Sequence, residues 1–127
     1  EDYRQEVLDL VNAQRTKYGL TALEMGDDNL TAAAQTRAEE IAVVNSHVRP
    51  DGSKCFTVLK DYGVTDTPTG ENAAWGSVSP EEVVNAWMNS EGHRANILNP
   101  EARKMSVGYY YNSNSTWGHQ WIQIFTK

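Results

Sequence analysis

The sequence predicts one α+β domain over residues 1–127, in which several helices pack on a small antiparallel sheet. Two segments in the first half have the apolar spacing of amphipathic helices, and two strand-like segments joined by a polar loop close the chain. The length of 127 residues suits one hydrophobic core, and no internal repeat or linker interrupts it. The expected architecture is therefore α+β, or a three-layer arrangement of the same elements.

Two amphipathic helices are predicted first. One covers residues 2–18, with Asp2 as its cap and Gly19 ending it in a left-handed conformation. The other covers residues 28–44 behind an aspartate cap, and its alanine-rich apolar stripe favours close packing against another element.

The middle of the chain is predicted to be more irregular. Pro50-Asp51-Gly52 indicates a turn, a short helix is expected around residues 55–62, and residues 65–70 are expected to form a loop. Residues 71–75 are apolar and flanked by glycines, which favours a short strand or extended segment.

A further helix is predicted to begin at Ser79. Ser79 can act as the N-cap, Pro80 suits the first helical position, and Glu82 completes a capping box. Gly92 is expected to stop this helix.

Two predicted strands, at 106–111 and 117–125, close the chain and are joined by the polar loop 112–116. The aromatic side chains of this hairpin are expected mainly to pack the sheet, and an aromatic platform facing carbohydrate or lipid is the alternative. They are Tyr109, Tyr110, Tyr111, Trp117 and Trp121.

The charge balance excludes some partners. A net charge of −6 with scattered basic residues argues against nucleic acid and against anionic lipid surfaces.

The sequence also bears on membranes, export and disulfides. No apolar run approaches the ~20 residues that span a bilayer, so no transmembrane segment is predicted. No signal-peptide pattern is present, and we expect any export signal to have been removed. The single cysteine, Cys55, excludes an internal disulfide and is expected to be buried and structural.

The segment Trp87–Leu98 concentrates specific chemistry. It places a Ser, a Glu, a His, an Arg and an Asn around one glycine, directly after the helix predicted from Ser79. The end of a rigid element is a good place to hold a ligand-binding group. Arg94 and Asn96 are expected to brace this region, which leaves His93 as its candidate site residue.

Five motifs, taken in order, resemble the CAP superfamily (cysteine-rich secretory proteins, antigen 5, pathogenesis-related 1), also called the SCP domain. They are Asn12-Ala13-Gln14-Arg15 with Gly19 and Leu23, Ser46-His47, Gly70-Glu71-Asn72, the Trp87–Leu98 segment, and Trp121-Ile122-Gln123. Each motif is weak alone, whereas their common order over nearly the whole chain is specific. The lack of disulfide cysteines resembles the bacterial branch.

This resemblance implies an α-β-α sandwich and a secreted, extracellular or cell-envelope location. Family members typically present a shallow cavity built from two His and two Glu, and some bind zinc or another divalent ion there. Sterol or lipid binding and proteolysis are among the activities proposed for the family.

The resemblance can be carried over to individual residues. His47 matches the first cavity histidine, and Glu71 matches the glutamate of the G-E-N motif. Ser90 stands at the second glutamate position and Gln120 at the second histidine position, so the family set is incomplete. His119 lies one residue earlier, and a regular strand would point it to the opposite face. The predicted ligand cavity consists of His47, Glu71, Ser90, His93 and Gln120.

His47, Glu71 and His93 are the candidate catalytic cluster, with His47 and His93 as the candidate metal ligands. Ser90 and His93 share a face if the helix continues through them. Two imidazoles, one carboxylate and an open position for water can form a zinc shell. The alternatives are a solvated or bracing His47, a Glu71 that caps backbone amides, and a His93 that braces the helix end.

Three functional hypotheses follow. The favoured one is a secreted or cell-envelope binding module without enzymatic activity, whose cavity holds a divalent metal, a small ligand, a lipid or cell-wall material. The alternative is a metal-dependent, peptidase-like hydrolase that uses His47, Glu71 and His93, with zinc as its candidate cofactor. The departures at Ser90 and Gln120 favour the binding module, because a catalytic set should be complete. A purely structural or adhesive domain is a third hypothesis.

Overall fold

A four-stranded sheet forms the middle layer of the structure, a computed structural model that describes residues 2–127. Its strands are β1 (Glu24–Met25), β2 (Pro68–Trp75), β3 (Lys104–Tyr111) and β4 (His119–Thr126). Their order is β1-β3-β4-β2, with β1 parallel to β3 and the other two pairings antiparallel. The side chain of Asp2 lies outside the described part of the chain, and so does the predicted Asp2 cap.

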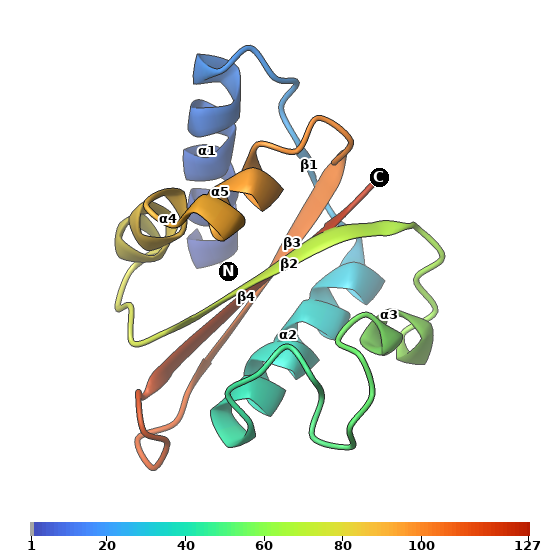
Figure 1. Cartoon of the computed structure of the whole chain (residues 1–127), viewed down its shortest axis with the longest axis vertical. Coiled ribbons are helices and arrows are strands. Elements are labelled where there is room, and N and C mark those ends of the chain that lie inside the picture. The colour runs from blue at the N-terminus through green and yellow to red at the C-terminus, as the bar shows by residue number, and fades with distance from the viewer. Residues whose placement is uncertain (1) are drawn as a thin grey trace.

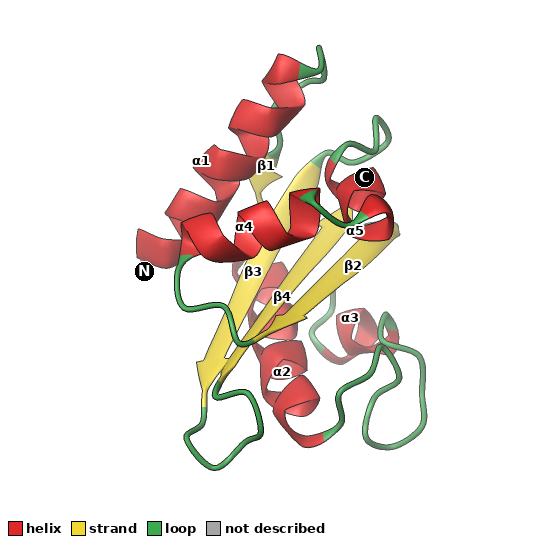
Figure 2. Cartoon of the chain, turned by 60° about the vertical axis from the view of Figure 1, so that its left-hand side comes forward, coloured by secondary structure: helices red, strands yellow, loops and turns green. Residues whose placement is uncertain are grey.

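Helices cover both faces of this sheet (Figures 1 and 2). One face carries α1 (Asp2–Lys17), α4 (Pro80–Met88) and α5 (Glu91–Ile97), and the other carries α2 (Asp28–Val43) and α3 (Thr57–Asp61). The structure is thus a three-layer α-β-α sandwich, which confirms the predicted fold class. Among residues 2–127, no helix combines the length and apolar composition that crossing a bilayer requires.

Two hydrophobic cores lie on the two sides of the sheet. In β4, Trp121 and Phe125 are buried in the core with α1 and α4, whereas Ile122 and Ile124 are buried in the core with α2. The two-residue period of a strand separates these two sets of side chains. Each face of β4 is therefore apolar, as expected for a sheet covered on both sides.

The end of α1 and the start of α2 carry the signals that the sequence predicts. Gly19, with φ of 78°, follows α1 in the left-handed region that favours glycine. Asp27 caps α2, since its Oδ1 accepts a hydrogen bond from the Leu30 amide at 2.9 Å. A Cβ atom at Gly108 of β3 would lie 2.1 Å from the Ala34 carbonyl oxygen, so glycine at this position allows α2 to approach the sheet closely.

The helix that follows Ser79 is shorter than predicted. Ser79 Oγ accepts from the Glu82 amide at 3.1 Å, while Glu82 Oε1 accepts from the Val78 amide at 2.9 Å rather than from Ser79. α4 ends at Met88. The predicted start of this helix at Ser79 is therefore confirmed, except that Glu82 bonds to the amide of Val78 and not to that of Ser79.

The prediction that Gly92 stops this helix is wrong. The chain breaks earlier, because Ser90 has an extended backbone (φ −117°, ψ 123°) and serves as the N-cap of a separate helix, α5. Gly92 is the second residue of α5, where its backbone stays helical.

The strands also differ from their predicted bounds. β2 begins at Pro68, inside the predicted loop, with a register irregularity between Pro68 and Gly70. β3 begins at Lys104, and β4 begins at His119 rather than at Trp117. Pairing with a neighbouring strand extends β2 and β3 beyond what local composition favours. The short β1 was not predicted, since two residues give no periodic signal.

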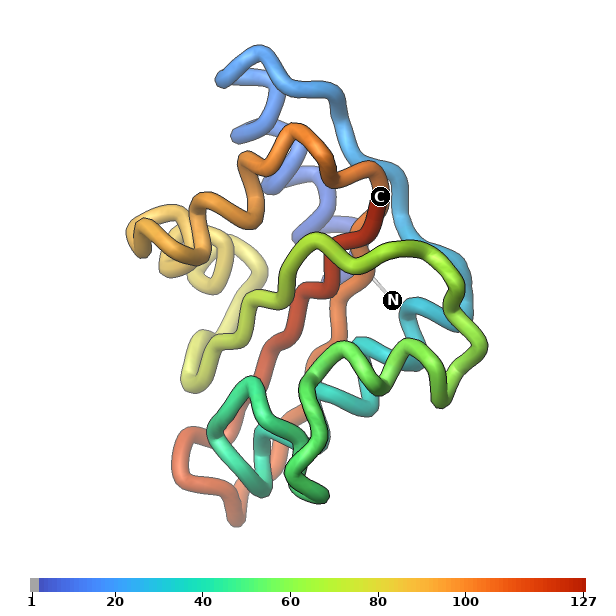
Figure 3. Tube along the Cα trace, turned by 45° about the vertical axis from the view of Figure 1, so that its right-hand side comes forward, coloured from blue at the N-terminus to red at the C-terminus, as the bar shows by residue number. Residues whose placement is uncertain are grey.

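The chain between α2 and β2, coloured teal to green in Figure 3, stays on the α2 side of the sheet. This path brings the loop after α2 to β2 and places His47 against Glu71.

Candidate functional site

Glu71 is the centre of the site. It lies in β2 on the face covered by α2, and only 6% of its surface is exposed. Arg37 of α2 donates to both of its oxygens, from Nε to Oε2 at 2.8 Å and from Nη2 to Oε1 at 3.1 Å. This bidentate geometry is the strong form of a carboxylate–guanidinium pair.

Arg37 was missed as a site residue because it was counted among the scattered basic residues. Its position carried a signal, however, since residues 30, 34, 37 and 41 share the apolar face of α2. The side chain is fully buried and also donates to the Ser46 carbonyl at 3.0 Å and to Glu40 at 2.9 Å. Arg37 thus fixes the start of the His47 loop as well as the Glu71 carboxylate.

His47 lies next to the same carboxylate. Its Nδ1 is 2.7 Å from Glu71 Oε1, and 54% of the side chain is exposed. The hydrogen bond to Glu71 raises the pKa of His47, with burial opposing part of that rise. Burial alone would raise the pKa of Glu71, but the hydrogen bonds from His47 and Arg37 outweigh it and lower the pKa. Glu71 is therefore an ionised group that orients the imidazole.

His93 approaches this pair from the other side of β2. It is the third residue of α5, and its backbone carbonyl accepts from Asn72 Nδ2 at 3.1 Å. Its Nδ1 is buried and has no hydrogen-bond partner among residues 2–127. Burial lowers the pKa of His93, and the positive charge of His47 lowers it further. The structure thus joins two of the predicted site residues directly, His47 and Glu71, and places His93 near enough for the charge of His47 to lower its pKa.

The remaining parts of the G-E-N motif hold α5 against β2. Asn96 Nδ2 donates to Asn72 Oδ1 at 2.8 Å, and Asn72 in turn holds the His93 carbonyl. A Cβ atom at Gly70 would lie 2.5 Å from Asn96 Oδ1, so glycine leaves room for that side chain. Arg94 Nη1 donates to the Met88 carbonyl at 3.0 Å, which agrees with the bracing role predicted for it.

Ser90 and Gln120 lie differently from what the sequence predicts. Ser90 caps α5 instead of continuing α4, so the face it was expected to share with His93 does not form. Gln120 pairs with Trp75 at the far end of β2, whereas Glu71 pairs with Ile124. At ~3.4 Å per residue this separates Gln120 from Glu71 by about 14 Å along the strand.

The buried Gln120 side chain serves the β3–β4 hairpin instead. It lies 3.0 Å from Ser115 Oγ, and its amide nitrogen can donate to the carbonyls of Tyr110 and Gly118. His119 lies on the face occupied by α1, where its Nδ1 is 2.6 Å from the Tyr109 hydroxyl. His119 is thus on the opposite face from Glu71, as the one-residue shift predicts.

Cys55 is a further neighbour of Glu71 that the sequence did not place there. Burial, followed by the negative charge of Glu71, raises the pKa of the Cys55 thiol to about 11. The thiol is therefore protonated at neutral pH, which fits a structural role. The predicted burial is only partial, however, since Cys55 is half-buried.

The donor set fits a metal ion poorly. Catalytic zinc sites use three protein ligands, and residues 2–127 contain no group of three or more His, Cys, Asp or Glu side chains that could hold a metal ion. Both Glu71 oxygens already accept hydrogen bonds. Only the two imidazoles remain as ligands, and we derive no chemistry through a metal.

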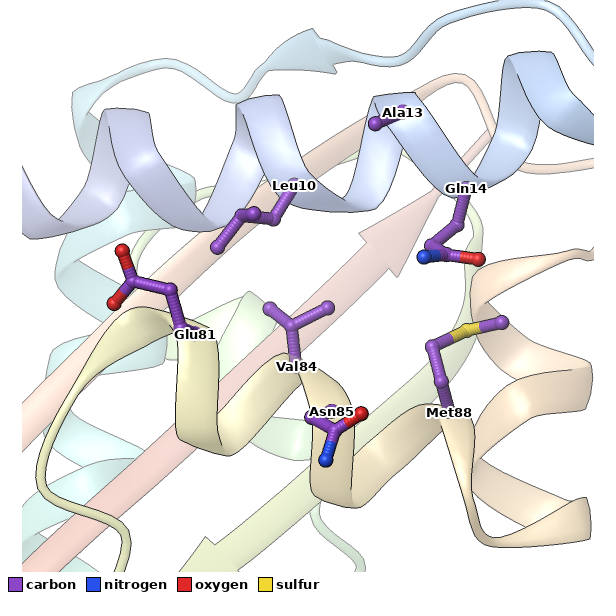
Figure 4. Close-up of a pocket in the computed structure, with 7 residues that line it drawn as sticks. All are labelled: Leu10, Ala13, Gln14, Glu81, Val84, Asn85 and Met88. Carbon is purple, nitrogen blue, oxygen red and sulfur yellow. The ribbon is translucent and has the colours of Figure 1, made fainter.

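Two cavities lie away from this site. One, of about 200 Å³, lies between α1 and α4, where Leu10 and Val84 form an apolar floor beside Gln14, Glu81 and Met88 (Figure 4). The other, of about 370 Å³, lies beside α3 and is lined by Lys54, Phe56, Thr57, Leu59, Lys60, Val64, Asp66 and Pro68. Neither is lined by any of the five residues predicted to form a ligand cavity.

A three-layer sandwich that holds a Glu–His pair between a G-E-N strand and the loop after α2 defines a CAP-type domain. The chain belongs to the cysteine-rich secretory protein family, CAP, whose pattern matches residues 8–125. This confirms the resemblance seen in the five motifs.

Two curated relatives come from Bacillus subtilis strain 168. The uncharacterised protein YkwD is 42% identical over 122 residues, which cover 94% of this chain and 47% of YkwD. The uncharacterised membrane protein YlbC is 34% identical over 115 residues, which cover 87% of this chain and 33% of YlbC. The chain therefore spans less than half the length of either relative.

Two solved structures are similar over nearly the whole chain. An extracellular SCP-domain protein of Bacillus anthracis gives a TM-score of 0.86 at 26% identity, covering 99% of this chain and 40% of that one. An outer surface protein of Borrelia burgdorferi gives a TM-score of 0.78 at 25% identity, and the match covers 97% of this chain and 90% of that one. These two similar structures thus belong to an extracellular protein and an outer surface protein of bacteria.

Proposed function

We propose that this chain is an extracellular or cell-envelope binding module, without enzymatic activity, whose His47–Glu71–His93 site takes a small polar ligand. The observation that carries the proposal is the buried Nδ1 of His93, which has no hydrogen-bond partner among the described residues. A buried polar atom without a partner costs about 1–3 kcal/mol. Because this nitrogen is closed off from solvent, a ligand regains that energy only if the His93 ring turns to expose it.

The neighbouring groups define the chemistry of the ligand. His47 is half exposed and oriented by Glu71, so it presents a nitrogen donor toward solvent. Burial and the charge of His47 favour the neutral form of His93, which can accept or donate at Nδ1 according to its tautomer. A small molecule with an acceptor for His47 and a polar group for His93 fits this pair.

A lipid-like ligand is a second proposal, and it concerns the cavity beside α3. Phe56, Leu59, Val64 and Pro68 supply apolar walls, and Lys54 and Lys60 supply positive charge. This combination suits an acyl chain with an acidic head group. Binding of oleate, followed by fluorescence displacement, should be lost in Val64→Glu, and equal binding by both proteins would exclude this cavity.

A metal-dependent hydrolase is the alternative function. The His47–Glu71 contact favours it, because a carboxylate that orients an imidazole is a common feature of metal sites and of general bases. No third free ligand accompanies the two imidazoles among residues 2–127, which argues for the binding module instead.

One set of titrations separates these functions. Small hydroxy acids and Zn²⁺ are added separately to the protein while the imidazole signals are followed by NMR. We expect saturable shifts of His47 and His93 with a polar ligand, lost in His93→Ala and retained in His119→Ala, the matched control on the opposite face. Shifts that survive in both variants would contradict the proposed site.

The hypothesis of a metal site and the hypothesis of enzymatic activity can each be decided by one experiment. Equal, negligible Zn²⁺ affinity in wild type and in the His47→Ala/His93→Ala double variant would exclude a metal site. Quantitative turnover of a peptide or cell-wall substrate, abolished by His93→Ala, would overturn the binding-module proposal.

A further inference from the structure

The β3–β4 hairpin carries no Asp, Glu, Lys or Arg after its first residue, Lys104. None of residues 105–126 is Asp, Glu, Lys or Arg, although these residues make up 22% of the chain. Core packing explains this for the strands, but the loop 112–118 is largely exposed and projects at one end of the molecule (Figures 1 and 2). An exposed segment of this kind ordinarily carries charge.

Two aromatic rings lie on this exposed end. Tyr111 is 55% exposed and Trp117 is 56% exposed. A Cβ atom at Gly118 would lie 3.3 Å from Tyr111 Cε1, and one at Gly76 would lie 3.7 Å from Trp117 Cε3. Each ring is thus supported by the backbone of a glycine on one side and open to solvent on the other. We call Tyr111, Trp117 and residues 112–116 between them the aromatic tip.

The loop of the aromatic tip is held by its own hydrogen bonds. The Asn112 amide donates to the Gly118 carbonyl at 2.8 Å, and the Asn114 amide donates to Asn112 Oδ1 at 2.9 Å. The Gly118 amide donates to Ser115 Oγ at 3.1 Å, and the side-chain amide of the buried Gln120 lies 3.0 Å from the same oxygen. A surface ordered before binding loses little entropy when a ligand binds.

The polar groups of the aromatic tip are amides and hydroxyls. Ser113, Asn114 and Thr116 are exposed beside the two rings. Aromatic faces attract the C–H faces of sugar rings, and amides and hydroxyls can donate to and accept from sugar hydroxyls. Nucleic acid and anionic lipid would instead require Lys or Arg here.

We propose that the aromatic tip binds an uncharged polysaccharide, with pyranose rings stacked on Tyr111 and Trp117. The loop amides and hydroxyls hydrogen-bond to the sugar hydroxyls. This site is separate from the His47–Glu71–His93 site, because β4 enters the hairpin at His119 and reaches the partner of Glu71 only at Ile124.

Tetrasaccharides of N-acetylglucosamine and of glucose are the probes, and binding is followed by tryptophan fluorescence and calorimetry. We expect saturable binding of at least one tetrasaccharide that does not change between low and high salt, since no charge is involved. Trp117→Ala and Tyr111→Ala should each weaken binding about tenfold or more, and Trp117→Phe should weaken it less.

The matched control is Tyr18→Ala, which removes an aromatic side chain of 57% exposure in the turn that follows α1. Tyr18→Ala and the His47→Ala/His93→Ala variant should bind as wild type does, which separates this inference from the proposed function. All three tip variants should retain the wild-type Tm, because the substituted rings are exposed.

Three results would overturn the inference. One is the absence of saturable binding of either tetrasaccharide up to about 10 mM, the limit for even a weak site. Another is binding that both tip alanine variants retain. The third is Trp117-dependent binding to phosphatidylcholine vesicles without saccharide binding, which would make the tip a membrane contact.

Discussion

The imidazole of His47 is held by the carboxylate of Glu71, with 2.7 Å between Nδ1 and Oε1. The two residues come from a loop and a strand, and Arg37 of α2 fixes the same carboxylate from the other side. Hydrogen bonds therefore connect the buried guanidinium of Arg37, through the Glu71 carboxylate, to the exposed imidazole of His47.

Glu71→Gln should lower the pKa of His47 toward or below its ordinary value of 6.5. The physical reason is that the hydrogen bond to an ionised carboxylate stabilises the imidazolium. An NMR titration of the histidine signals measures the shift. Glu39→Gln, at an exposed position of α2, is the control and should leave the pKa unchanged. An unaltered pKa in Glu71→Gln would show that His47 is not coupled to Glu71 in solution.

Arg37→Met should destabilise the protein by about 3–5 kcal/mol, because it leaves the buried Glu71 carboxylate without its main partner. Urea denaturation gives the free energy of unfolding. The double variant Arg37→Met/Glu71→Leu should lose less than the two single variants add up to, since no unpaired charge remains. Additive losses would show that the pair contributes nothing beyond its separate side chains.

The pH dependence of stability should contain two opposing histidine contributions. The pKa of His47 is raised on folding, so its contribution is present below pH ~6.5 and is lost as the pH rises through the raised value. The pKa of His93 is lowered, so its contribution is present above pH ~6.5 and is lost as the pH falls through the lowered value.

Single variants separate these contributions. Between pH ~5 and ~8, His47→Gln should gain stability relative to wild type as the pH rises, and His93→Gln should lose it. Thermal unfolding at several pH values measures how the stability of each variant changes with pH, with His119→Gln as a control. Equal slopes in the His47 and His93 variants would contradict the assigned shifts.

Gly108→Ala should destabilise the protein by about 1–3 kcal/mol or more. The added methyl would lie 2.1 Å from the Ala34 carbonyl oxygen, and that atom belongs to the backbone of a packed helix. Gly92→Ala is the matched control, since no atom lies within 4 Å of the added methyl and the position is helical. Its free energy of unfolding should stay the same or rise slightly, and a comparable loss in both variants would refute the close approach of α2.

Cys55 should react slowly with thiol reagents in the folded protein. A pKa of about 11, against an ordinary value of 9.0, lowers the thiolate fraction about a hundredfold at pH ~8. Ellman's reagent measures the rate, and the urea-unfolded protein supplies the reference. A folded rate equal to the unfolded rate would show that Cys55 is neither buried nor near Glu71.

Much of the secondary structure was predictable because its signals are local. Asp27 and Ser79 cap their helices, and Gly19 follows the end of α1, as local backbone preferences dictate. The end of α4 was misplaced, since Gly92 is compatible with a helix and the break occurs at Ser90. The family was predictable for a related reason, because its motifs are short and keep their order along the chain.

The site was only partly predictable. His47 and Glu71 were identified through the family motifs, and His93 through the chemistry of its segment. Gln120 was misassigned because its position along β4, not its residue type, decides what it contacts. The burial of Arg37 could be suspected from its place on the apolar face of α2, but its partner could not.

The sequence by itself determined most of the helices, the strand periodicity, the family and three candidate site residues, His47, Glu71 and His93. Only the tertiary structure decided which side chains meet: Arg37 with Glu71, and Cys55 close to that pair. Helix caps and strand periods depend on residues a few positions apart, and the chain itself fixes their geometry. Contacts such as Arg37–Glu71 join residues on different elements, and they exist only after the helices and the sheet have packed.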